Sequence, residues 1–348
     1  MQTTSKAVEQ ITMAAASDIG TLRDENEDFY FFSIPKKFFI VCDGMGGHEK
    51  GALASKIAGA TLRDLIFASE TLRDIVIEKS FLDVSRICQD IDKKLPIQAL
   101  KLISGIRLAN RRILSYSRYN PKMKEMATTV AAAVVQQGRI FIAHVGDSRV
   151  YRLRHGKLSC LTTDHSWLNE LLEDKDITQK EGVGFREKNV LTRALGVAPA
   201  IKVDLQIEAV EPGDLYLLCS DGLSNALSNA TIENILSGFH DSLQIKITDL
   251  VNQAKFRDGT DNITGGLIQV PDKWPNGKIL AEKYIFNEEP KEVTEYLEQC
   301  IKSIFPKTTS VSNRRKKIVA LLIILISICF LIGFLLVRAD GLATLLIW

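Results

Sequence analysis

The chain has 348 residues and is 46% hydrophobic, enough apolar content for one large folded domain or two smaller ones. Its 44 Lys and Arg residues nearly balance its 42 Asp and Glu residues, and a net charge of +2 gives no global field that would favour nucleic acid. Six scattered cysteines form no CxxC pair, which argues against a disulfide framework and a zinc site and indicates a reducing compartment.

Strand-like runs rich in Val, Ile and Phe recur along the first 270 residues, with turn residues between them. Two stretches, 52–67 and roughly 97–119, show helical spacing instead. Short strands joined by tight turns, with helices grouped separately, predict an α+β protein with antiparallel sheets rather than a wound parallel sheet. The expected strands cover 29–34, 38–42, 128–135, 140–145, 150–153, 215–220 and 263–270.

The composition changes beyond Val270. We treat 1–15 as an N-terminal arm, 16–270 as the folded domain and 271–317 as a linker. Within that linker, apolar residues at steps of three and four between two prolines predict one amphipathic helix, which would pack on the folded domain or on a second copy. The linker ends in a basic segment beside a long apolar run.

That apolar run, 318–337, contains only one polar residue, Ser327. A helix of about 20 apolar residues is long enough to cross the hydrocarbon core, and a buried core helix is the weaker alternative. Four basic residues at 314–317 precede the run and only Arg338 follows it, which predicts the N-terminal side in the cytoplasm. No signal peptide is recognisable. We therefore expect a single-pass, tail-anchored membrane protein with a short far-side tail over 338–348.

Three aspartates lie where apolar, strand-like runs end or begin. Asp43 and Asp221 follow such runs, and Asp261 opens one. A single Asp-Gly pair is ordinary turn chemistry. Three such positions in one chain, together with the acidic pair Glu27 and Asp28, predict a site for a hard divalent cation, which takes oxygen ligands.

The order of the motifs is more specific than any one of them. In chain order they are Gly20 to Asp28, Asp43-Gly44-Met45-Gly46-Gly47-His48, Thr128-Thr129, His144 to Arg149, Asn189 to Gly196, Cys219 to Ser224 and Asp258 to Thr264. Over about 16–270 this series resembles the PP2C (PPM) family of metal-dependent protein phosphatases in its bacterial form. The resemblance implies a sandwich of two antiparallel sheets flanked by helices, with a binuclear Mn²⁺ or Mg²⁺ centre at one end.

The resemblance also implies the ligands of that centre. Asp43 would bridge two cations, and a hydroxide made from bound water would attack phosphorus in line without a covalent intermediate. The chain departs from the family pattern at Ala52, where bacterial relatives usually carry glutamate. The implied ligands are Glu27 or Asp28 (directly or through water), Asp43, the Gly44 carbonyl, Asp221 and Asp261.

Three further residues have roles that stay open at this point. Arg23 would clamp the phosphate with its planar fork of donors, unless it is a solvated turn arginine. Asp147 matches the position of a third, weaker metal ion, although it could equally cap a hairpin. His48 is the imidazole nearest the first Asp-Gly and is a candidate general acid, with metal-bound water as the alternative. The resemblance implies that animal and plant members carry a histidine directly after this Asp-Gly, whereas Met45 fills that place here, as in bacterial relatives.

The activity implied by the resemblance is hydrolysis of phosphoserine and phosphothreonine in proteins. The alternative is a catalytically silent phosphatase-like scaffold or sensor, which the complete set of carboxylates disfavours. A membrane anchor would concentrate the enzyme near membrane-bound partners, and a transmembrane Ser/Thr kinase and its substrates are the candidates, with no nucleic acid. The polar stretch between His165 and Asn189 is expected to be a flap beside the site, and 67–96 a lineage insertion.

Overall fold

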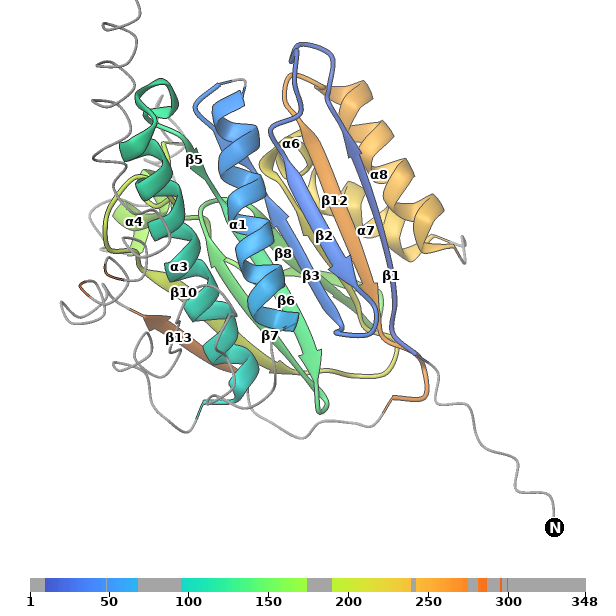
Figure 1. Cartoon of the computed structure of the whole chain (residues 1–348). Helices are drawn as coiled ribbons and strands as arrows, with labels where there is room; N and C mark the ends of the chain where they lie inside the picture. Colours follow the sequence, from blue (N-terminus) through green and yellow to red (C-terminus); the bar gives the residue numbers. More distant parts are fainter. Residues whose placement is uncertain are drawn as a thin grey trace, which may run out of the picture. The chain divides into compact units, whose positions relative to one another are not determined.

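A computed structural model of the protein describes residues 10–47, 49–67, 95–173, 190–238, 242–274 and 281–286, together with Glu295 and Gln299. The chain divides into two units, 1–301 and 302–348, and every element described below belongs to the first. Figure 1 shows its strands in two stacked sheets with helices on both outer faces.

Every strand pair in the described part of the chain is antiparallel. One sheet has five strands in the order β1 (Thr12–Asp18), β12 (Ile263–Gln269), β11 (Leu215–Cys219), β8 (Arg149–Arg154) and β9 (Lys157–Cys160). The other has six strands in the order β13 (Glu282–Phe286), β10 (Val203–Ala209), β7 (Arg139–Val145), β6 (Val130–Gln136), β3 (Phe38–Cys42) and β2 (Phe29–Ser33). A two-stranded ribbon pairs β4 (Gly44–Met45) with β5 (Ala127–Thr128).

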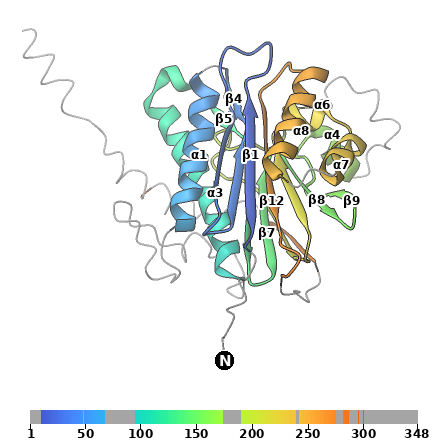
Figure 2. The same cartoon turned by 90° about the vertical axis from the view of Figure 1, so that its right-hand side faces the viewer.

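Helices cover both outer faces of the sandwich (Figure 2). The six-stranded sheet carries α1 (Glu49–Phe67) and α3 (Ile97–Tyr119), and the five-stranded sheet carries α7 (Asn229–Ser237) and α8 (Leu243–Arg257). Three shorter helices, α4 (Trp167–Glu173), α6 (Asp221–Ala226) and η1 (Pro121–Met123), connect these elements.

The core follows from the period-two alternation of buried strands. On β3, Phe38 and Ile40 pack towards α1 and α3, whereas Phe39 and Val41 pack between the two sheets. All five residues of β3 are buried, because helices cover one face of this strand and the second sheet covers the other. The prediction of an α+β fold with two antiparallel sheets is confirmed.

Several elements differ from the sequence-based expectation. Strands β1 and β10 and helices α7 and α8 were not predicted, and β13 lies beyond Val270, in the stretch treated above as linker. The predicted span over 318–337 and the stretch 68–94 lie outside the described residues, and of the predicted amphipathic helix only Glu295 and Gln299 are described, both as helical. Among the helices that are described, none combines the length and apolarity needed to cross a bilayer.

Candidate metal centre

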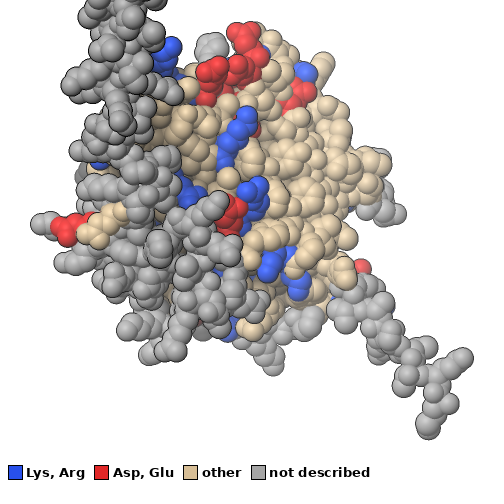
Figure 3. Space-filling model, in the orientation of Figure 1, with Lys and Arg blue, Asp and Glu red and all other residues tan. Residues whose placement is uncertain are grey.

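The strand register brings the predicted carboxylates to one edge of the sandwich. On the five-stranded sheet Cys219 pairs with both Gly265 and Arg149, so the residues just beyond these strand ends lie side by side. On the six-stranded sheet Val130 pairs with Val145, which places the ends of β3 and β7 at the same edge. Figure 3 shows acidic side chains gathered at this edge, where the β1–β2 loop lies. Loops at this edge carry Asp28, Asp43, Asp147 and Asp261, and Asp221 opens helix α6 there.

Two threonines hold Asp43 at the end of β3. Its backbone N–H donates to Thr129 Oγ1 at 3.0 Å. Its carbonyl accepts from Thr128 Oγ1 at 2.8 Å and from the Thr129 N–H at 2.9 Å. Thr129 Oγ1 also lies 2.6 Å from Ser148 Oγ, in the loop that carries Asp147. The Thr128-Thr129 pair thus fixes the Asp43 backbone relative to the loop that carries Asp147.

Burial and mutual repulsion raise the pKa values of these carboxyl groups. Burial, together with the neighbouring Asp28 and Asp221 charges, raises the pKa of Asp43 well above its usual range. The same two causes raise the pKa of Asp28 to about 7, with Asp221 and Asp261 as the charges that contribute. The pKa of Asp147 also rises to about 7, because of burial and Asp221. Arg149 lowers the pKa of Asp147 and Asp221 and Arg23 pairs with Asp261, but these charges do not offset burial and repulsion at Asp28, Asp43, Asp147 and Asp221.

The donor set fits hard divalent cations. Carboxylate and carbonyl oxygens are the ligands that Mg²⁺, Mn²⁺ and Ca²⁺ prefer. Asp28 Oδ2 accepts a hydrogen bond from Ser220 Oγ at 2.8 Å, whereas its Oδ1 is buried and accepts none from any residue that the structure describes. A buried carboxylate oxygen of this kind is costly unless a cation or water reaches it. The geometry therefore supports the predicted metal role of Asp28.

Glu27 packs closely against two glycines, Gly44 and Gly51. Its side chain is 6% exposed, and a Cβ atom on Gly51 would fall 1.8 Å from Glu27 Oε2. A Cβ atom on Gly44 would fall 2.2 Å from the Gly51 carbonyl oxygen. Two glycines thus let α1 approach the Asp43-Gly44 turn closely, and Glu27 fills the space between them.

Arg23 stands at the exposed rim of the site. Its Nη2 donates to Asp261 Oδ2 at 2.9 Å, and the two side chains are 46% and 38% exposed. No other residue in the described part of the chain bonds its guanidinium fork, so its remaining N–H groups can meet an incoming anion, as the phosphate-clamp prediction requires. His48, the predicted general acid, lies outside the described residues. So do residues 174–189, which make up most of the flap predicted between His165 and Asn189.

Three residues support the site without being among its predicted ligands or catalytic residues. Asn262 accepts from the Glu27 N–H at 2.8 Å and donates to the carbonyls of Ile19 and Glu25 at 2.9 and 3.1 Å. Ser220 joins Asp28 to the Thr264 backbone. Thr129 joins Asp43 to Ser148. Asn262 and Ser220 do stand beside predicted aspartates, but their partners are distant in sequence.

Comparisons with known proteins agree with this geometry. The family model "Protein phosphatase 2C" matches residues 23–255. The serine/threonine phosphatase stp of Listeria monocytogenes is 33% identical over 256 residues, covering 73% of this chain and 93% of that protein. The crystal structure of the Mycobacterium tuberculosis serine/threonine phosphatase PstP/Ppp superposes with a TM-score of 0.62 at 29% identity, covering 76% of this chain and 100% of that one.

A second solved structure bears on the metal. The catalytic domain of PstP in complex with two manganese ions matches with a TM-score of 0.60 at 29% identity, covering 76% of this chain and 99% of that domain. The matched family model spans the strand-end carboxylates Asp28, Asp43, Asp147 and Asp221. The chain belongs to the protein phosphatase 2C family, whose bacterial relatives named above are serine/threonine phosphatases.

Proposed function

We propose that this serine/threonine phosphatase hydrolyses phosphoserine and phosphothreonine in proteins with the help of two Mn²⁺ or Mg²⁺ ions. The observation that carries the proposal is the convergence of five aspartates at one edge of the sandwich, where burial and mutual repulsion raise the pKa values of four of them. Cations would remove that repulsion. The two manganese ions of the related PstP domain support the same assignment.

Some residues of the site would bind the cations, and others hold those ligand residues in place. The proposed ligand groups are the carboxylates of Asp43, Asp221 and Asp261, the Gly44 carbonyl, and Glu27 or Asp28. Bound divalent ions supply charge neutralisation for the phosphoryl group and a water of lowered pKa. Hydrogen bonds with Thr128 and Thr129 hold the Asp43 backbone, and a hydrogen bond from Ser220 holds the Asp28 carboxylate, so that the site needs little reorganisation when charge develops.

The substrate phosphate would bind at the rim, where Arg23 lies. Its fork suits a dianion, because two N–H groups can meet two phosphate oxygens while Asp261 orients the side chain. We assign the proton donor for the leaving serine or threonine oxygen to His48 or to water in the site. Asp147 is the proposed holder of a third, weaker ion.

The experiment uses the full chain purified in detergent and a phosphothreonine peptide, with phosphate release measured in Mn²⁺, in Mg²⁺ and in EDTA. We expect EDTA to abolish release, and Asp221→Asn to lower it at least about 100-fold, since loss of an outer partner of a metal ligand alone costs 10–100-fold. Asp249→Asn, on α8 away from the site, is the control. Full activity in EDTA would refute metal dependence. Full activity of the Asp221 variant would remove Asp221 from the proposed ligands.

We further propose that residues 318–337 anchor the enzyme in a membrane with its catalytic domain in the cytoplasm. The support is the length and apolarity of this run and the four basic residues before it. An anchored phosphatase meets membrane-bound phosphoproteins at raised effective concentration, and a membrane Ser/Thr kinase is the proposed class of partner. Retention in the membrane pellet after carbonate washing tests the anchor, and release of the full chain into the supernatant would refute it.

A further inference from the structure

Beside the Asp147 loop lies a second buried cluster that the mechanism above does not use. His144, His165 and Asp204 bring their ligand atoms within 4.8 Å of one another. The two histidine rings stack at 4.6 Å between centroids, and His144 stands directly across from Asp204 in the β7–β10 pair. Two histidines and an aspartate at this distance are a familiar metal-binding combination.

The hydrogen bonds show that this cluster is not arranged for a metal ion. His165 Nδ1 accepts from the Gly146 N–H at 3.1 Å, so the neutral ring carries its proton on Nε2. That nitrogen faces Asp204 Oδ1 at 3.3 Å. Arg193 Nη1 lies 3.0 Å from the same carboxylate oxygen and 3.2 Å from His165 Nε2. A guanidinium therefore already occupies the place where a metal ion would sit.

The cluster is instead a hydrogen-bonded connection that ends at a site residue. Asp204 Oδ1 lies 3.3 Å from His165 Nε2. His165 in turn makes two hydrogen bonds with Gly146, because its ring Nδ1 accepts from the Gly146 N–H and its backbone N–H donates to the Gly146 carbonyl at 3.0 Å. Gly146 has φ of +104°, and a Cβ atom there would fall 2.6 Å from Thr129 Cγ2. The next residue is Asp147, so the position of His165 sets the position of that carboxylate.

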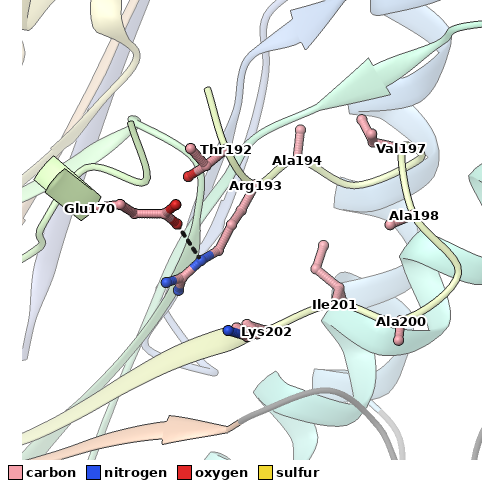
Figure 4. A pocket seen from close by; sticks show the side chains of 9 residues that line it. All are labelled: Glu170, Thr192, Arg193, Ala194, Val197, Ala198, Ala200, Ile201 and Lys202. Atoms are coloured by element: carbon pink, nitrogen blue, oxygen red, sulfur yellow. Dashed lines mark ion pairs between the residues drawn. The ribbon is translucent and has the colours of Figure 1, made fainter. Parts of the chain in front are cut away.

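Arg193 connects the same cluster to the two chain segments that flank residues 174–189. Its Nε lies 3.4 Å from Glu170 Oε1 on α4, while its Nη1 contacts Asp204. Figure 4 shows Glu170 and Arg193 facing each other at the polar end of a cavity of about 200 Å³ whose other end is apolar. The Thr192 N–H also donates to the His165 carbonyl at 2.9 Å.

We propose that Asp204 and Arg193 are positioning residues, which hold His165 and the segments at 167–173 and 190–193 so that Asp147 is placed to bind the third, weaker cation. This inference rests on the proposed function, because it assigns Asp147 to a metal ion. It predicts that disrupting the cluster weakens one binding step for Mn²⁺ and leaves the two tighter steps unchanged. It also predicts a looser Gly146 backbone in the metal-free protein.

The test compares the full chain with Asp204→Ala, Asp204→Asn and the control Glu208→Gln. Glu208 lies on the same strand and pairs with Arg152 at 2.6 Å, so it reports the cost of losing a comparable ion pair that does not reach Gly146. Amide hydrogen exchange of Gly146 is measured without metal, and Mn²⁺ binding is measured by calorimetry. Activity against Mn²⁺ concentration is the third readout.

For Asp204→Ala we expect amide hydrogen exchange at Gly146 to become at least about tenfold faster. We expect the Mn²⁺ affinity of the weakest binding step to fall about 10–100-fold, as when a hydrogen-bond partner of a metal ligand is removed. Asp204→Asn keeps an acceptor and should stay within about threefold of the wild type, as should Glu208→Gln. Unchanged exchange and binding in Asp204→Ala would overturn the inference, and so would equal effects of Asp204→Ala and Glu208→Gln.

Two further measurements keep the inference separate from the proposed function. Nitrogen-15 spectra of the wild type should show His165 as the Nε2–H tautomer, and the Nδ1–H tautomer would overturn the inference even if a variant fails to fold. If Asp147→Asn binds as many Mn²⁺ ions as the wild type, the third-ion assignment of the proposed function fails, and the metal part of the inference fails with it. Faster Gly146 exchange in Asp204→Ala would then still support the positioning part.

Discussion

Replacing Asp28 with asparagine should stabilise the metal-free protein at alkaline pH. The Asp28 carboxyl group is buried beside Asp221 and Asp261, and its pKa rises to about 7. Compared with an ordinary aspartate pKa of about 4, this corresponds to about 4 kcal/mol between its two protonation states. Between these pH values the folded state keeps the proton and the unfolded state has released it. Stability therefore falls as pH rises from about 4 to about 7, and the loss is complete above that range.

Asparagine at position 28 carries no charge and can still accept the hydrogen bond from Ser220. In EDTA at pH 8 we expect the variant to be about 2–4 kcal/mol more stable than the wild type, with the lower figure applying if the neighbouring carboxyl groups share the proton. At pH 4 the two proteins should be nearly equal. With saturating Mn²⁺ the order should reverse, because only the wild type keeps the full ligand set that binding stabilises.

Urea unfolding of both proteins at pH 4 and pH 8, with EDTA or with Mn²⁺, measures these differences directly. Asp249→Asn on α8 controls for removal of one negative charge. A variant that is no more stable than the wild type in EDTA at pH 8 would refute the claim that burial and repulsion at Asp28 destabilise the metal-free protein.

Three other substitutions test separate parts of the site. Thr129→Val leaves the Asp43 N–H without its acceptor and should cost about 1–3 kcal/mol in urea unfolding, whereas Thr129→Ser should cost less than half of that. Gly51→Ala places a methyl group 1.8 Å from Glu27 Oε2, so we expect a cost of about 1–3 kcal/mol and lower Mn²⁺ affinity by calorimetry; wild-type affinity would contradict this reading. Arg23→Ala should lower kcat/KM for a phosphopeptide about 10–100-fold, the loss expected for a charged hydrogen bond, while its exposed ion pair contributes at most about 1 kcal/mol to stability; an unchanged kcat/KM would remove Arg23 from phosphate binding.

The parts of the fold that could be predicted are those where local sequence decides the outcome. Strands β3, β11 and β12 are covered on both faces, and each reads as a continuous run dominated by apolar residues. Helix α8 also carried a readable signal that was missed. Ser242 caps its first turn by accepting from the Ile245 N–H, and buried residues recur at Ile247, Leu250, Val251 and Ala254.

Strand β10 shows what the sequence could not reveal. Its residues alternate regularly, which is typical of a strand with one solvent-facing side. In the structure its polar side, which carries Asp204 and Glu208, is instead largely buried against Arg193 and Arg152. Those arginines lie 11 and 56 residues away in the chain, so no local pattern distinguishes a buried ion pair from an exposed face.

In the candidate site too, local sequence predicts some features and contacts between distant residues determine the others. The five aspartates were predicted because each stands beside an apolar run or within a motif. The hydrogen bonds that orient them join residues 86 and 192 positions apart, as in Asp43 with Thr129 and Asp28 with Ser220. Such pairs depend on strand register across two sheets, which a single sequence does not specify.

Strand β13 has a practical consequence for anyone who wishes to produce the catalytic domain alone. The family match ends at residue 255, yet Val203 to Ile207 on β10 pair with Glu282 to Phe286, and Tyr284 and Phe286 pack against the helix-covered core. Cutting the gene after Val270 would strip this strand away and leave the outer edge of β10 unprotected. Unpaired strand edges of that kind can pair with other chains and cause aggregation. Soluble expression should therefore require a boundary beyond Phe286.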